Sequence, residues 1–86
     1  MVFLILTRAG YEELVAQFRQ PPSPLWVNTG VLSPGELAQL RQAGSEVTDF
    51  SCPINIQDSS AIEVAISTVQ EHHAGKRVWV EYAANL

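Results

Sequence analysis

The segment Trp26–Phe50, WVNTGVLSPGELAQLRQAGSEVTDF, contains the local signals that decide the fold. It opens within a short apolar, β-prone run, 25–27, which is followed by the turn-favouring residues 28–30. It closes on residues 46–50, whose mixed polarity is typical of a partly exposed strand. A helical pattern lies between the two runs. The segment therefore predicts two parallel strands joined by a right-handed helical crossover.

The helix within this segment has clear start and stop signals. Ser33 and Glu36 have the spacing of a capping box, and Pro34 takes the first helical position, where a missing N–H does no harm. Gly44 is expected to end the helix in a left-handed conformation. The residues expected to face the core share a spacing of three: Leu37, Leu40 and Ala43.

The segment before it predicts another strand and helix. Residues 2–6 form a continuous apolar run, which is typical of a strand covered on both faces. A helix is expected to open at Gly10 and to stop at the proline-rich segment 20–24. The apolar stripe of this helix has the spacing i, i+3, i+4, i+7 and consists of Tyr11, Leu14, Val15 and Phe18.

The whole chain then predicts a βαβαβαβ arrangement. A third helix is expected to be capped by one of residues 58–60 and to end at Gly75, and residues 77–83 alternate as a half-exposed strand. We expect one three-layer α/β domain over residues 1–86, with a four-stranded, mainly parallel sheet and three helices. The two most apolar runs belong at the centre, which favours the strand order 3-2-1-4; the flavodoxin-like order 2-1-3-4 is the alternative.

Composition narrows the classes of partner. The net charge is −4 with only five Lys and Arg residues, which argues against binding to nucleic acid. The apolar run 2–6 is far too short to cross a bilayer, and no basic segment precedes it, so no membrane association is expected. The single cysteine, Cys52, fits a reducing compartment. We expect a cytoplasmic protein.

Common catalytic and cofactor motifs are missing from the sequence. It contains no GxGxxG, GxxxxGK[ST], GxSxG or CxxC pattern. The helices are expected to carry acidic residues near their starts, which leaves no bare N-terminus for a phosphate. Those acidic residues are Glu12, Glu13, Glu36, Asp58 and Glu63. We therefore predict no cofactor and no catalytic residue, and consider an enzyme the less favoured class.

A small-ligand site is the main alternative hypothesis. Thr7 and Arg8 follow the first strand, and Asn28 and Thr29 follow the second, at the sheet edge where open α/β folds bind ligands. Arg8 has two interpretations: an exposed side chain paired with a glutamate of the first helix, or an anchor for a carboxylate.

A third hypothesis is a hydrolase-type enzyme that uses Asp49 and Glu81. Both residues lie near the carboxyl ends of predicted strands, as a pair of acid–base carboxylates requires. In the favoured strand order they lie on opposite edges, too far apart to cooperate, whereas in the alternative order they are neighbours.

The two histidines do not predict a metal site, and the single cysteine does not predict a catalytic nucleophile. His72 and His73 project about 100° apart on a helix and cannot chelate one ion together, so structural roles are expected and no metal site is predicted. Cys52 has no neighbouring cation to activate it, and we expect a buried or half-buried, unreactive thiol.

The leading hypothesis is a small non-enzymatic domain that acts through protein contacts, with a homodimer joined at an edge strand or helix face as one form of it. Ile54, Ile56, Trp79 and Tyr82 lie on elements expected to be peripheral and form the predicted interaction surface. For Trp79 we favour packing in the core, with half-exposure at the sheet edge as the alternative.

Overall fold

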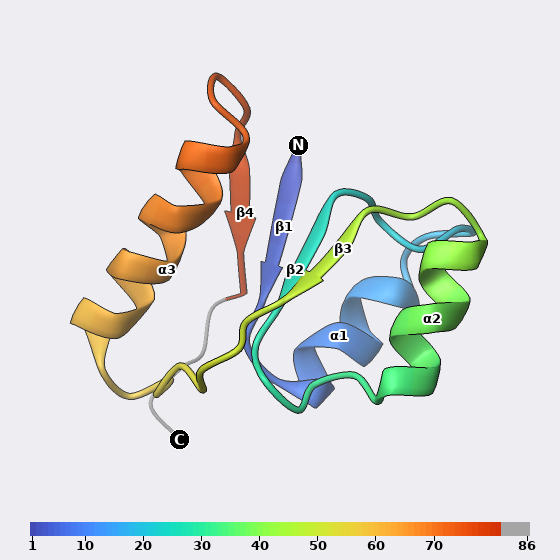
Figure 1. The fold of residues 1–86 in the computed structure, drawn as a ribbon, viewed down its shortest axis with the longest axis horizontal. Helices are drawn as coiled ribbons and strands as arrows, with labels where there is room; N and C mark the ends of the chain where they lie inside the picture. Colours follow the sequence, from blue (N-terminus) through green and yellow to red (C-terminus); the bar gives the residue numbers. More distant parts are fainter. Residues whose placement is uncertain (82–86) are drawn as a thin grey trace.

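The computed structural model describes residues 1–81 and consists of a parallel four-stranded sheet with helices on both faces (Figure 1). The elements in chain order are β1 (Val2–Ile5), α1 (Arg8–Val15), β2 (Leu25–Val27), α2 (Pro34–Gln42), β3 (Val47–Asp49), α3 (Ser59–His72) and β4 (Val78–Val80). The strand order is β3-β2-β1-β4 and every neighbouring pair is parallel. The predicted fold class and the favoured order 3-2-1-4 are confirmed.

Two apolar clusters fill the spaces on either side of the sheet. Along β1, Ile5 points to the cluster under α1 and α2, whereas Val2 and Leu4 point to the cluster under α3. This alternation gives β1 two buried faces, as expected from its continuous apolar run. The sheet is therefore the middle of three layers, with α3 alone on one face and α1 and α2 on the other (Figure 1).

The α2 start signal is confirmed in full. The Ser33 hydroxyl accepts a hydrogen bond from the Glu36 N–H at 3.1 Å, and the Glu36 carboxylate accepts one from the Ser33 N–H at 2.9 Å. Gly44 follows the helix with a φ of 92°, a conformation that side chains other than glycine rarely adopt. The prediction that Ala43 faces the core is wrong: it is exposed, because it is already the C-cap residue.

Helix α1 differs from the prediction at both ends. It begins at Arg8 rather than Gly10, because the Thr7 hydroxyl caps it by accepting a hydrogen bond from the Gly10 N–H at 3.0 Å. It ends at Val15, so Phe18 lies beyond the helix and is exposed. The earlier start leaves no acidic residue in the first turn of α1, contrary to the prediction for Glu12 and Glu13.

Candidate functional site

The position at which an open α/β sheet normally binds a ligand is filled here by a side chain of the protein itself. The chain leaves β1 toward β2 on one side and returns to β4 on the other, so the change of direction lies between β1 and β4. Glu81, just after β4, extends its carboxylate into this position. Its Oε1 accepts hydrogen bonds from the N–H groups of Leu6 and Thr7 at 2.8 and 2.9 Å, and its Oε2 accepts one from the Thr7 hydroxyl.

This arrangement explains why Gly10 is a glycine. A methyl group at Gly10 would overlap the Glu81 carboxylate, so the helix can approach the carboxylate closely only without a side chain there. The carboxylate also places a negative charge near the N-terminus of α1, which its own first turn does not supply. Thr7 connects the two groups, because its hydroxyl donates to Glu81 and accepts from Gly10.

Arg8 makes internal contacts with four other residues. Its guanidinium lies 2.8 Å from the Glu36 carboxylate and 3.4 Å from the Glu12 carboxylate, and it donates to the Val31 carbonyl oxygen at 3.1 Å. The hydrogen bond with Glu36 raises the pKa of Arg8 further above its ordinary range. The same guanidinium packs over the Tyr11 ring. Arg8 thus joins the start of α1 to the start of α2.

The contacts around Arg8 shift the pKa values of Glu36 and Tyr11. The pKa of Glu36 is lowered, first by the hydrogen bond from the Ser33 N–H and then by the hydrogen bond from Arg8. Partial burial raises the pKa of Tyr11, and the negative charge of Glu36 adds to this effect. Both shifts follow from structural contacts.

Asn28 is a buried polar residue that fastens the loop after β3 to the sheet. Its amide nitrogen donates to the carbonyl oxygens of Leu6 and Ile54 at 3.1 and 3.0 Å. Its side-chain oxygen accepts from the N–H groups of Thr29 and Ile54, both at 2.8 Å. Thr29 adds a hydrogen bond from its hydroxyl to the Phe50 carbonyl oxygen.

The four residues of the predicted ligand site do lie at the carboxyl ends of β1 and β2. Thr7, Arg8, Asn28 and Thr29 each make at least one side-chain hydrogen bond to another residue of the protein. A ligand would have to compete with these contacts. The ligand-binding hypothesis stays a prediction, but the geometry of Arg8 does not favour it.

The two carboxylates of the hydrolase hypothesis follow opposite edges of the sheet. Asp49 ends β3 and lies 3.6 Å from the Arg41 guanidinium, whereas Glu81 follows β4 and binds the turn after β1. Two strands, β2 and β1, separate them. This arrangement does not support a cooperating acid–base pair.

The histidines have structural contacts, and the cysteine differs from its prediction. Trp26 donates from Nε1 to Nε2 of His73 at 3.1 Å, which ties the end of α3 to β2, and His72 contacts the Thr68 carbonyl oxygen. Cys52 is exposed rather than buried, because Ile54 and Ile56 are the residues of this loop that turn inward. Within residues 1–81, no group of three or more His, Cys, Asp or Glu side chains is placed to hold a metal ion.

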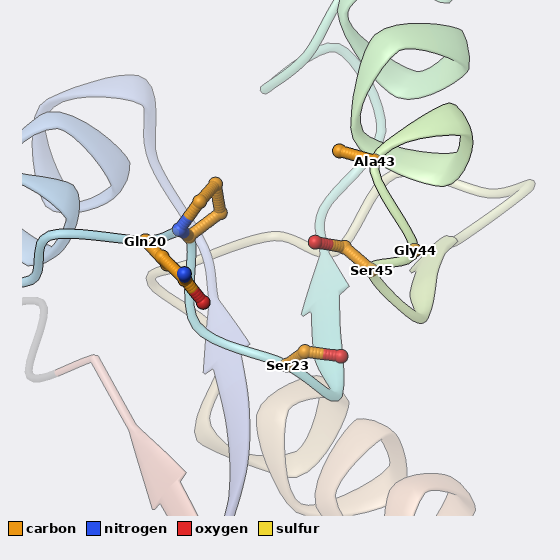
Figure 2. A pocket seen from close by; sticks show the side chains of 6 residues that line it. Gln20, Ser23, Ala43, Gly44 and Ser45 are labelled. Carbon is orange, nitrogen blue, oxygen red and sulfur yellow. The ribbon is translucent and has the colours of Figure 1, made fainter.

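A cavity is present at the edge of the sheet opposite to the predicted ligand site. It has a volume of about 350 Å³ and lies at the amino ends of β2 and β3 (Figure 2). Its lining consists of Gln20, Pro21, Ser23, Ala43, Gly44 and Ser45. None of these residues carries an ionisable side chain, so the lining offers neither a charge to bind a ligand ion nor a group for acid–base chemistry.

The residues of the predicted interaction surface separate into three groups. Ile54 and Ile56 are partly buried against the cluster under α3. Trp79 is 41% exposed, so the favoured prediction of core packing is wrong and the half-exposed alternative is correct. Tyr82 lies outside the described residues.

Two phenylalanines extend the exposed surface of Trp79. The Phe3 ring lies between the two others, with centroid distances of 6.1 Å to Trp79 and 5.9 Å to Phe18, and Phe18 is itself 46% exposed. We call Phe3, Phe18 and Trp79 the edge aromatic surface. The sequence pattern predicts Phe18 in a helix and Phe3 in a doubly covered strand. The number of predicted elements could have indicated this exposure, because three helices cannot cover both faces of a four-stranded sheet.

No protein-family model, curated protein or solved structure matched the chain when it was compared with them. In residues 1–81, no helix combines the length and the apolar character needed to cross a membrane.

The contact between Gly10 and Glu81 gives a first prediction. We expect Gly10→Ala to lower the free energy of unfolding by about 1–3 kcal/mol, because the added methyl displaces the carboxylate. In a Glu81→Ala background the same change should raise it by up to ~1 kcal/mol, because alanine favours a helix over glycine. Urea unfolding of the four proteins measures both values. An equal loss in the two backgrounds would contradict the role given to Glu81.

The hydrogen bonds of Asn28 give a second prediction. Asn28→Ala should lower the free energy of unfolding by about 2–4 kcal/mol, because it leaves buried backbone groups of Leu6 and Ile54 without partners. Asn55→Ala is the matched control, since Asn55 is exposed and its side chain accepts a hydrogen bond from the nearby Gln57 N–H. A control loss as large as the Asn28 loss would show that Asn28 has no special role.

The lowered pKa of Glu36 gives a third prediction. A depressed pKa in the folded state stabilises the fold above the ordinary value of 4.5, and this contribution is lost as the pH falls through the folded-state pKa. The urea midpoint should therefore decrease below about pH 4.5, and Glu36→Gln should reduce that decrease. The matched control is Glu13→Gln. If both variants keep the wild-type pH dependence, Glu36 is not responsible for it.

Proposed function

We propose that this protein is a small interaction domain that binds a protein partner at the edge aromatic surface and along β4. The observation that carries the proposal is the clustering of Phe3, Phe18 and Trp79 beside an open strand edge. Single exposed apolar residues are normal on protein surfaces, whereas grouped aromatic side chains are typical of interfaces.

The topology supplies the reason for the exposure. Helix α3 contacts β4 and β1, while α1 contacts β1 and α2 contacts β3. Val78 and Val80 of β4 pack against the cluster under α3, so Trp79 projects to the other face, where the described chain places no helix over β4 (Figure 1). A bound partner would cover this indole.

The backbone of β4 supports the same site. The Arg77 carbonyl oxygen accepts from the Val2 N–H, and the Glu81 N–H donates to the Leu4 carbonyl oxygen, so the odd-numbered residues bond to β1. Val78 and Val80 therefore direct their N–H and C=O groups toward the open edge. No other strand of the described chain lies there. Groups of this kind pair with an added strand in many protein complexes.

A small-ligand function has less support, since the side chains proposed for it already form hydrogen bonds to other residues of the protein. We also propose a cytoplasmic location, supported by the single cysteine of the sequence.

Photo-crosslinking at Trp79 tests the proposed function. A photoreactive residue at position 79 should form adducts with a protein, either another protein of the source cell or a copy of this chain. The matched control is the same residue at Val64, which is 66% exposed on α3. We expect clearly stronger adducts from position 79. Equal or absent protein adducts from the two positions would overturn the proposal.

A further inference from the structure

We propose that the partner of β4 is a second copy of this chain, paired with it in antiparallel fashion about a two-fold axis normal to the sheet. This inference rests on the proposed function and names the partner for the same surface. Most soluble oligomers have such closed symmetry, in which one surface patch contacts its own copy. An edge strand is suited to this pairing only if its outward groups match when it is reversed.

The outward groups of β4 do match when the strand is reversed. With the axis beside Trp79, Val78 lies opposite Val80 of the second copy, and Val80 lies opposite Val78 of the second copy. Each pair is of the type that exchanges both backbone hydrogen bonds, because these are the two residues whose N–H and C=O groups face the open edge. The two sheets then join into one continuous sheet.

The same register brings the aromatic side chains together. Trp79 lies opposite Trp79 of the second copy, in a pair of the closely spaced type. Both indoles are on the face of β4 that lacks a helix in the described chain, so nothing there separates them. Phe3 and Phe18 of each copy extend the contact outward. The exposed aromatic area of one copy is thereby covered by the equivalent area of the other.

Charges are complementary in this register. Arg77 falls opposite Glu81 of the second copy, on the same face as Trp79. Glu81 is half-buried, and in the described chain its Oε2 accepts a hydrogen bond from Thr7 alone, so this oxygen has a lone pair free for the guanidinium. Arg77 is exposed, and the described part of the chain gives it no ion pair. Opposite charges directly across two strands stabilise their pairing.

Analytical ultracentrifugation of the full chain between about 1 and 300 µM tests the inference. We expect a concentration-dependent species with twice the 9.5 kDa mass of the chain. Arg77→Glu should weaken the dimer by about tenfold, since it places like charges opposite each other at two symmetric positions. Lys76→Glu is the matched control: it makes the same change in net charge at an exposed neighbour that precedes the paired residues 77–81, and should have a smaller effect.

A second variant tests the backbone pairing. Val80→Pro removes an N–H that faces the open edge and takes no part in bonding to β1, a position at which edge strands tolerate proline. We expect the variant to keep the circular dichroism spectrum of the folded protein and to sediment as a monomer. If it unfolds, Arg77→Glu decides, because an exposed charge reversal leaves the core unchanged.

Two results would overturn the inference: a monomer over the whole concentration range, or a dimer that neither Arg77→Glu nor folded Val80→Pro weakens. The crosslinking experiment at position 79 distinguishes a failure of the dimer inference from a failure of the proposed function. A monomeric protein that forms adducts with a different protein from position 79 overturns only the dimer, whereas the absence of specific adducts overturns both.

Discussion

The arrangement of the sheet depends on the contact of the Glu81 carboxylate with the turn between β1 and α1. This contact joins the last described residue to the first turn of the chain, and its partners Thr7 and Leu6 lie 74 and 75 positions away in the sequence. Helix α1 has only eight residues, which is too short to be stable alone in water. The carboxylate accepts from the Leu6 and Thr7 N–H groups just before the helix and places a negative charge near its N-terminus. Together with the bond from the Glu81 N–H to the Leu4 carbonyl oxygen, this contact holds β4 against β1.

Polar side chains at the carboxyl edge of the sheet are used mainly to complete the helix starts, which leaves few of them free to bind a ligand. Thr7 and Glu81 complete α1, Ser33 and Glu36 complete α2, and Asp58 caps α3 through the N–H groups of its first turn. Each of these five side chains already has a hydrogen-bond partner within the protein. Because a ligand gains affinity mainly from groups that are otherwise unsatisfied, this edge is poorly suited to binding one.

Much of the fold could be predicted because its signals are local. The capping box of α2 involves residues three positions apart, and the apolar runs of β1 and β2 mark the centre of the sheet. The role of Glu81 could not be predicted, because glutamate after a strand is common and its partner lies at the other end of the chain. The sequence pattern predicts a helix start at Gly10, whereas the Thr7 hydroxyl caps α1 two residues earlier. Gly10 is instead the position that lies against the carboxylate, which no local pattern indicates.

The exposed edge and the contact of Glu81 are connected by the side-chain alternation of β4. Trp79 and Glu81 are two residues apart and therefore project to the same face, while Val78 and Val80 project to the other. A shift of one residue would place Trp79 under α3, expose both valines and carry Glu81 away from the α1 start. The carboxylate thus fixes the register that exposes the indole. Three helices on a four-stranded sheet leave part of one face uncovered, and the register decides which side chain occupies it.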